Sequence, residues 1–234
     1  MKPRVYLDAP LEQPGEVSLH DAPAHHLARV LRLREGDALT VFNGRGGEWD
    51  AQFIGKRRVR ILSFNAIERE SPLQITLVQG VSSGDRMDYT VQKAVELGVA
   101  AIQPLMTKKG VVKLEGARAS ARIEHWRKIA IAACEQCGRN RVPEVRPLIH
   151  FDQYRPDGGK TRLLLSAEGE PIRKLKTESE ATIAAGPEAG FAPEEQAALE
   201  RVGFVKASLG PRVLRTETAA LAALAALNAL QGDF

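Results

Sequence analysis

The sequence predicts a two-part α/β protein, in which a small β-rich unit precedes a larger unit of alternating strands and helices. Three observations support this prediction. Short β-prone runs fill the first part of the chain, a strand–helix–strand pattern begins near residue 75, and the last helix is almost entirely alanine and leucine. A chain of 234 residues can hold one large domain or two smaller ones, and we place the two domains at 1–70 and 73–234.

Residues 1–70 have the pattern of a compact β-barrel with one helix. Runs of β-branched and aromatic residues predict strands at 38–42, 49–54 and 59–64. The glycine-rich segment 43–47 suits a hairpin connection, because asparagine and glycine tolerate the positive φ that such turns require. One short helix is expected from His25 to Leu33. The polar segment 67–72 ends in proline and is the expected linker.

Beyond this linker the apolar pattern becomes that of an α/β unit. Strands are expected at 75–79, 101–105, 162–165, 181–185 and 204–207. Helices are expected at 87–98, at 123–137, near 193–195 and at 216–230. The last of these is apolar nearly all round, so it must be covered on most sides, and we favour a dimer interface there.

Composition and cysteine content exclude several classes of protein. The sequence has no apolar stretch long enough to span a bilayer and no signal-peptide pattern at its start, so we expect a cytoplasmic protein. Cys134 and Cys137 lie within a helical pattern, without the strand that precedes a redox motif and without a second cysteine pair for zinc. We therefore expect reduced thiols and no metal. The net charge of +4 permits a polyanionic partner without requiring one.

The strongest local signal for chemistry is the segment 184–191, in which a strand runs into a Gly-Pro turn and then toward a helix. A phosphate-binding loop is the obvious rival, but the required glycine, lysine and hydroxyl spacing is absent. The turn carries Glu188 instead, and a carboxylate tolerates a cationic ligand such as the sulfonium of S-adenosylmethionine. Taken alone, the segment fits an ordinary strand-to-helix turn equally well.

A second segment, 208–219, repeats the design of a strand, a Gly-Pro turn and a helix. Two such turns can face one ligand, with backbone groups holding an adenine and with Leu209 and Leu214 as apolar walls. Arg215 and Glu217 would then project from the start of the last helix beside the cofactor.

These motifs resemble those of the RsmE-type ribosomal RNA (uracil-N3)-methyltransferases, which belong to the SPOUT class. The resemblance spans nearly the whole chain. It rests on His25 to Arg32, Gly36-Asp37, Asp85-Arg86-Met87, Gln92 to Val99, Glu135-Gln136, Arg139, Arg141, Pro143, Gly186-Pro187-Glu188 and Leu209 to Ala219.

The resemblance implies a C-terminal SPOUT α/β knot, which is a trefoil, and a small N-terminal PUA-like β-barrel that binds RNA. It also implies a homodimer, S-adenosyl-L-methionine as cofactor without a metal, and methylation of uridine N3 in the 16S ribosomal RNA of the small ribosomal subunit. The expected cofactor-binding residues are Leu165, Ser166, Gly186, Pro187, Glu188, Gly190, Leu209, Gly210 and Leu214. The family usually has glycine where this chain has Ala189, and alanine there would cost about 1 kcal/mol if the position needs positive φ.

Methylation at N3 requires that the proton on this nitrogen leave, so we expect a carboxylate and an arginine beside the base. Glu217 is the candidate base and Arg215 the candidate for stabilising charge on the uracil oxygens. The alternative is that both merely pair with other parts of the chain near the helix start. The arginines expected to contact RNA phosphates, each with a surface ion pair as its alternative, are Arg4, Arg29, Arg32, Arg139 and Arg141. Arg29 and Arg32 are expected on one helical face.

Two other kinds of function remain open from the sequence. One is a SPOUT methyltransferase that acts on another RNA position, such as a ribose hydroxyl or guanine. The other is a non-enzymatic RNA-binding factor for ribosome assembly. A nucleotide-dependent redox enzyme is disfavoured, because no glycine-rich dinucleotide motif follows the first strand of the α/β part.

Overall fold

The computed structural model describes residues 2–20, 24–25, 27, 29, 31–158 and 161–234. The chain forms two compact units. The N-terminal unit consists of residues 1–70 and 134–142, and the C-terminal unit of residues 71–133 and 143–234. The expected second domain included 134–142, but this segment packs with the N-terminal unit.

A single five-stranded sheet forms the N-terminal unit. Its strands are β1 (Arg4–Tyr6), β2 (Gly15–Ser18), β3 (Ala38–Phe42), β4 (Glu48–Phe53) and β5 (Arg58–Asn65). They lie in the order β1-β3-β4-β5-β2, with β1 parallel to β3 and the other pairs antiparallel. Leu39, Val59 and Ile61 are buried in its core. The three strands expected from the sequence are confirmed.

The helix expected from His25 to Leu33 is shorter than predicted. Ala24, His25, Leu27 and Arg29 are helical, whereas Leu31 already lies in a bend. Arg32 has a φ of 53°, and the backbone N–H of Leu33 donates to the carbonyl oxygen of Leu27 at 3.0 Å. Because the chain turns back at this point, Arg29 and Arg32 do not share a helical face.

The C-terminal unit contains a parallel sheet. Its strands are β6 (Gln74–Gly80), β7 (Ala101–Met106), β8 (Glu144–Val145), β9 (Ile149–His150), β10 (Thr161–Pro171), β11 (Glu180–Ala185) and β12 (Val205–Ser208). Six of them follow the order β12-β10-β11-β6-β7-β8, and β9 also pairs with β7. The five strands expected from the sequence are confirmed. Parallel pairing brings the carboxyl ends of β6, β10, β11 and β12 to one edge, where ligands of such sheets bind.

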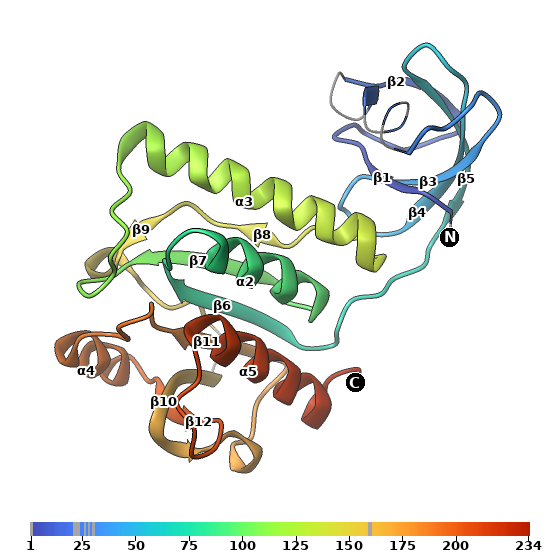
Figure 1. Cartoon of the computed structure of the whole chain (residues 1–234). Coiled ribbons are helices and arrows are strands. Elements are labelled where there is room, and N and C mark those ends of the chain that lie inside the picture. Colours follow the sequence, from blue (N-terminus) through green and yellow to red (C-terminus); the bar gives the residue numbers. More distant parts are fainter. Residues whose placement is uncertain (1, 21–23, 26, 28, 30, 159–160) are drawn as a thin grey trace. The chain divides into compact units, whose positions relative to one another are not determined.

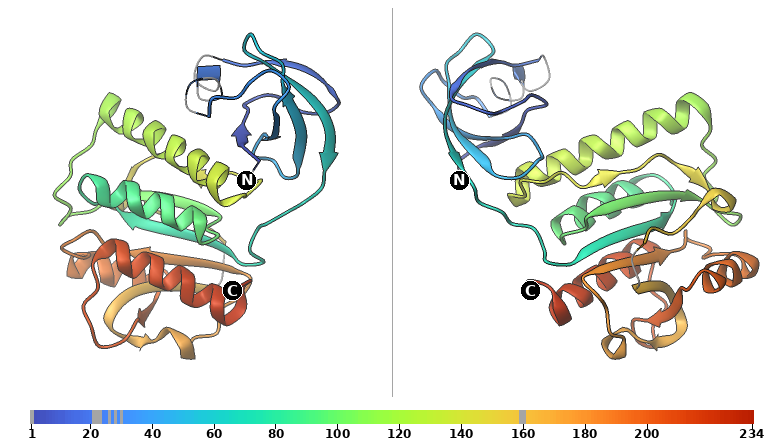
Figure 2. Two further views of the ribbon diagram at one scale, coloured as in Figure 1. Left: turned by 45° about the vertical axis from the view of Figure 1, so that its right-hand side comes forward. Right: turned by 180° about the vertical axis from the view of Figure 1, so that it is seen from behind.

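The helices of the C-terminal unit are α2 (Asp85–Glu96), α3 (Gly116–Cys137, whose last residues lie in the N-terminal unit), α4 (Pro193–Arg201) and α5 (Thr216–Gln231). Two 3-10 turns complete it, η2 (Phe151–Gln153) and η3 (Ile172–Lys174). Figures 1 and 2 show α5 beside α2, and α5 also packs on β6 and β11. None of the helices in the described ranges is long and apolar enough to cross a membrane.

The buried side chain of Asn228 fastens α5 to its neighbours. Its amide nitrogen donates to the carbonyl oxygen of Leu97 at 2.8 Å, and its amide oxygen accepts from the Ser71 hydroxyl at 2.6 Å. Since a buried amide needs partners for both groups, these bonds fix the position of α5 against the end of α2 and the start of β6. These bonds hold the last turns of α5, and the first turn lies at the other end of the helix.

Candidate active site

Two adjoining cavities lie at the carboxyl edge of the sheet, next to β10, β11 and β12. The larger measures about 470 Å³ and the smaller about 130 Å³. All nine residues expected to bind a cofactor line them. Gly186, Pro187, Glu188 and Gly190 line the larger cavity, Ser166, Leu209 and Gly210 the smaller, and Leu165 and Leu214 both. The structure therefore brings the two Gly-Pro turns together around one space.

The first Gly-Pro turn leaves no space for a Cβ atom on Gly186, or on Gly80 at the end of the neighbouring strand β6. A Cβ atom on Gly186 would lie 2.8 Å from the backbone nitrogen of Phe191, and one on Gly80 would lie 2.5 Å from the Cδ of Pro187. Gly190 has a φ of 68°, a conformation that favours glycine. Ala189 does not have positive φ, so the strain considered for alanine at this position does not arise.

Glu188 lines the larger cavity but is bonded to the start of α2. Its Oε1 accepts from the Ser83 backbone N–H at 2.9 Å, from the Ser83 hydroxyl at 2.8 Å and from Arg86 Nη1 at 3.1 Å. Burial opposes its ionisation, yet these bonds outweigh burial and lower the pKa of the carboxyl. Because Arg86 pairs with it, Glu188 offers less negative charge to a cationic ligand than the sequence suggested.

Glu217 and Arg215 also line the larger cavity, at the start of α5. The Oε2 atom of Glu217 is buried and has no hydrogen-bond partner within the described ranges. Arg215 is exposed and occupies the N-cap position of α5. Within the same ranges neither side chain forms an ion pair, so the alternative that both are engaged with other parts of the chain finds no support.

Arg86 is a cavity residue to which the sequence assigned no role. Its side chain is 44% exposed and pairs with Glu188, and both residues line the larger cavity. The sequence could have indicated this position, because Arg86 lies in the first turn of the helix that follows β6. The N-terminal ends of such helices face the carboxyl edge of a parallel sheet.

Two of the five arginines expected to bind RNA are instead structural. Arg4 has a side chain only 9% exposed, bonds to Glu48 at 2.5 Å and to the Asn140 amide oxygen at 2.7 Å, and lies over the Phe42 ring. Arg139 is buried and pairs with Glu70, with its Nε 3.0 Å from Oε2. The structure corrects these two expectations, because both guanidinium groups are enclosed by carboxylates and carbonyls of their own unit.

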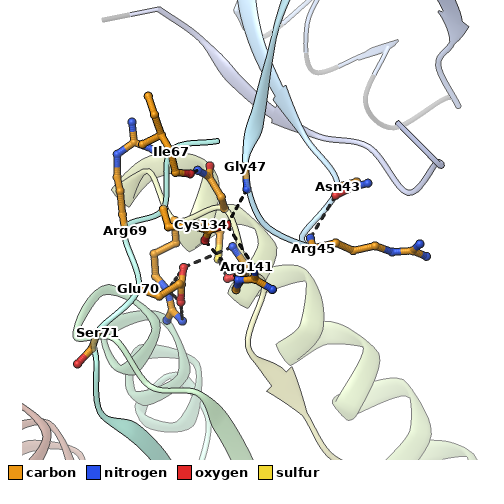
Figure 3. A network of polar contacts seen from close by, with 12 residues as sticks. Asn43, Arg45, Gly47, Ile67, Arg69, Glu70, Ser71, Cys134 and Arg141 are labelled. Atoms are coloured by element: carbon orange, nitrogen blue, oxygen red, sulfur yellow. Dashed lines mark hydrogen bonds and ion pairs between the residues drawn. The ribbon is translucent and has the colours of Figure 1, made fainter. Parts of the chain in front are cut away.

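The other three expected arginines, Arg29, Arg32 and Arg141, are exposed. Arg141 forms an ion pair with Glu68 at 3.3 Å and retains a side chain that is 56% exposed. Its backbone pairs with that of Arg45 in the β3–β4 connection. Figure 3 shows the Arg45 side chain pointing away from this network of polar contacts. Arg45 is thus another exposed cation, on the segment that pairs with Arg141.

A separate cavity of about 450 Å³ lies near the ends of β7 and β9 and the start of α4. Four carboxylates line it together with two lysines, and one of these lysines, Lys108, pairs with Glu194. It contains neither Gly-Pro turn and no carboxylate oxygen that is buried without a partner among the described residues. The cavities between the two Gly-Pro turns are therefore the better candidate for the active site.

Comparison with known proteins matches both parts of the chain to families. Residues 69–228 match the model of an RNA methyltransferase domain, and residues 21–62 match that of an RNA methyltransferase PUA domain. The chain is 34% identical to the ribosomal RNA small subunit methyltransferase E of Buchnera aphidicola, over 99% of this chain and 95% of that protein. The protein of the same name from Bacillus subtilis is 32% identical, over 95% of each chain.

Solved structures give the same result over the full length. The ribosomal RNA small subunit methyltransferase E of Neisseria gonorrhoeae, solved bound to S-adenosyl methionine, is 40% identical with a TM-score of 0.91 over 100% of both chains. A Legionella pneumophila protein solved in complex with SAM is 39% identical with a TM-score of 0.95, again over 100% of both chains. The fold is that of a SPOUT-type α/β methyltransferase with an N-terminal PUA-like domain. The chain therefore belongs to the RNA methyltransferase family that includes the ribosomal RNA small subunit methyltransferases E.

Proposed function

We propose that this protein transfers a methyl group from S-adenosylmethionine to N3 of a uridine in the 16S ribosomal RNA of the small ribosomal subunit. The observation that carries this proposal is the Oε2 atom of Glu217, which is buried without a partner in a cavity walled by two Gly-Pro turns. A buried carboxylate oxygen that lacks a donor is costly unless a ligand supplies one, and the N–H of a uracil is such a donor.

The residues around the cavities fit the cofactor. The turn at 186–190 has no space for a Cβ atom on Gly186, so its backbone can approach a flat ligand closely. Leu165 and Leu214, which line both cavities, supply apolar walls for an adenine. The relative from Neisseria gonorrhoeae, which was solved with S-adenosyl methionine, supports the same assignment. Ser166, Pro187, Glu188, Gly190, Leu209 and Gly210 complete the proposed site.

The chemistry requires that one proton leave the base and that charge on its oxygens be stabilised. S-adenosylmethionine supplies a methyl group already activated by a sulfonium. Glu217 accepts the proton of N3 on Oε2, and the electron pair left on the nitrogen forms the new N–C bond while the bond between the methyl carbon and sulfur breaks and S-adenosylhomocysteine leaves. Arg215, at the N-cap of α5 and exposed, donates to the uracil oxygens onto which the negative charge spreads. Most of the rate then comes from alignment, because the transfer is an in-line displacement.

The base must be unpaired or extruded to reach these groups, because N3 lies on the pairing edge of uracil. We assign residues 1–70 to RNA binding and 73–234 to methyl transfer. The exposed Arg29, Arg32 and Arg141 are the proposed phosphate contacts. Arg4 and Arg139 are left out of this set, since both are held in ion pairs inside their unit.

The assembly that we propose is a cytoplasmic homodimer with a knotted C-terminal domain and a barrel-like N-terminal domain. On α5 the buried side is made by residues such as Ala220, Leu224 and Leu227, while Leu221, Ala222 and Ala225 remain partly exposed. This second apolar side suits a second subunit. Strand β12 lies at the edge of the sheet, whereas α5, the next helix along the chain, packs on β6 and β11 in its middle. Segment 209–215 must therefore pass back across the sheet, as a knotted chain requires.

Calorimetric titration of the purified protein with S-adenosylhomocysteine tests the cofactor site without requiring an RNA substrate. We expect one site per chain, and we expect Gly210→Trp to abolish binding, because Gly210 has a φ of 97° and lines the smaller cavity. Gly158→Trp is the matched control, since Gly158 is an exposed loop glycine away from these cavities. Binding followed by no methyl transfer to small ribosomal subunits would favour the assembly-factor function instead.

A further inference from the structure

We propose that Thr216 is a positioning residue that couples the first Gly-Pro turn of the cofactor site to the helix start that carries Glu217. This inference rests on the proposed function, because it assigns a role within the same site. Thr216 lies between Arg215 and Glu217 and is itself buried. Its hydroxyl donates to the carbonyl oxygen of Gly186 at 2.5 Å.

The Gly186 carbonyl group is held by two side-chain donors. Besides the Thr216 hydroxyl, the amide nitrogen of Gln79 approaches the same oxygen at 3.4 Å. The peptide that joins Gly186 to Pro187 is therefore held at its oxygen by the start of α5 and by the end of β6. Since a peptide is planar, fixing this oxygen also orients the turn that follows it.

Gln79 adds a second connection and explains why the hydroxyl has a defined direction. This fully buried residue donates from Nε2 to Thr216 Oγ1 at 2.9 Å and to the Gly80 carbonyl oxygen at 3.0 Å. The carbonyl oxygens of Gly80 and Gly186 beside Nε2 can only accept, so reversing the amide would lose these bonds. Thr216 Oγ1 thus accepts from Gln79 and must donate its single proton to Gly186.

The start of α5 depends on this arrangement more than most helix starts do. Its N-cap residue is Arg215, and no side chain among the described residues caps the first turn. Helix starts are usually stabilised by a capping oxygen, which is missing here. The bonds of Thr216 do not satisfy the N–H groups of this turn, but they attach the first turn of α5, including Glu217, to the Gly186 turn. A ligand that orders the turn then also orders Glu217, and the coupling is reciprocal.

The test compares Thr216→Val with Thr216→Ser. Valine keeps the shape of threonine and removes the hydroxyl, whereas serine keeps the hydroxyl. We expect Thr216→Val to bind S-adenosylhomocysteine about tenfold more weakly, as loss of one buried hydrogen bond allows, and Thr216→Ser to remain close to the wild type. Even at saturating cofactor, we expect the kcat of Thr216→Val to be lower than that of the wild type, because Glu217 is no longer held in place.

A double-mutant cycle separates this positioning role from general destabilisation. In the Thr216→Val background, the further change Glu217→Gln should lower kcat much less than it does in the wild type, since Glu217 is already misplaced. The inference is wrong if the factors by which the two changes lower kcat simply multiply in the double variant. It is also wrong if Thr216→Val binds the cofactor product and turns over as the wild type does. Thr216→Ala repeats the test without a buried branched side chain if the valine variant melts far below the wild type.

The behaviour of the wild type distinguishes a failure of the coupling through Thr216 from a failure of the proposed function. A wild-type protein that fails to bind S-adenosylhomocysteine or to transfer methyl groups refutes the proposed function. A wild type that binds and transfers, together with a Thr216→Val variant that does both equally well, refutes only the coupling through Thr216.

Discussion

Glu188 and Glu217 line the same cavity, but their carboxylates have opposite surroundings. Three donors converge on Oε1 of Glu188, whereas Oε2 of Glu217 is buried without a partner among the described residues. A carboxylate that is already hydrogen-bonded to an arginine is a poor proton acceptor, and one without a donor is a better one. This difference between two residues of the same type is why we assign the proton transfer to Glu217 and a structural role in the turn to Glu188.

Replacing Glu217 by glutamine should remove proton transfer and preserve shape. We expect kcat to fall by about a hundredfold or more, which is the usual contribution of a general base, with the Kd for S-adenosylhomocysteine within about threefold of the wild type. Single-turnover methylation at saturating cofactor measures the change. Glu194→Gln is the matched control, because Glu194 pairs with Lys108 in the other cavity. A Glu217→Gln variant with normal turnover would remove Glu217 from the mechanism.

The two cysteines should differ in reactivity although they lie one helical turn apart. Cys134 is fully buried, its thiol faces the Arg141 carbonyl oxygen, and burial raises its pKa to about 12. Because the thiolate is the reactive form, Cys134 should resist iodoacetamide in the native protein at pH 8, while the partly exposed Cys137 is modified first. Mass spectrometry of the labelled peptides checks this order. Equal labelling of both residues would show that the end of α3 opens in solution.

At the scale of elements, the segment 138–142 behaves as part of the N-terminal unit because polar contacts attach it there. The Gly46 backbone N–H donates to the Asn140 carbonyl oxygen, and the Asn140 side chain donates to the Ile67 carbonyl oxygen. Asn140 itself is fully buried. Figure 3 shows Glu70 and Arg141 within this network. Residues 68–70 form ion pairs in the same network. Most of the expected linker, 67–72, is therefore attached to the N-terminal unit.

Arg139 and Arg141 provide a matched pair that separates a structural from a surface arginine. Arg139→Met leaves the partly buried Glu70 without its partner, so we expect a loss of about 3 kcal/mol in the free energy of unfolding. Arg141→Met breaks an exposed pair, for which roughly 0 to 1 kcal/mol is expected. Urea unfolding measures both. Equal and small losses would mean that the Arg139–Glu70 pair is not as enclosed as it is in this structure.

The stability of the N-terminal unit should fall at acid pH because of Glu48. Burial raises the pKa of this carboxyl, but bonds from Arg69 and Arg4 outweigh burial and lower it below its ordinary value. A lowered folded-state pKa means that the stabilisation is complete above the unfolded-state pKa and disappears as the pH falls through the folded-state pKa. Melting temperatures of the wild type and Glu48→Gln should therefore converge between about pH 5 and pH 3. A gap that stays constant over this range would contradict the assignment.

For the whole molecule, the signals that are local in sequence predicted the fold well. The strands at 38–42 and 181–185 and the helix at 216–230 were recognisable from apolar pattern and composition, and both Gly-Pro turns from their residues. The short strands β1 and β2 were missed, since three or four residues give too little pattern.

What the sequence could not predict depends on contacts between distant residues. Arg4 is an isolated basic residue in the sequence, and only the fold places it beside Glu48 and Asn140. The same is true of Thr216 and Gln79, which lie 137 positions apart and share one hydrogen bond. Local patterns therefore located the candidate site, whereas the roles of its individual side chains required the structure.

The most direct test of the account is methyl transfer to small ribosomal subunits from a strain that lacks this modification, followed by nucleoside analysis of the RNA. With labelled S-adenosylmethionine, we expect 3-methyluridine as the product, its loss in Gly210→Trp, and its persistence in Gly158→Trp. Label in a methylated ribose or in guanine would contradict the assignment of N3. Tight cofactor binding without any labelled nucleoside would contradict catalysis itself.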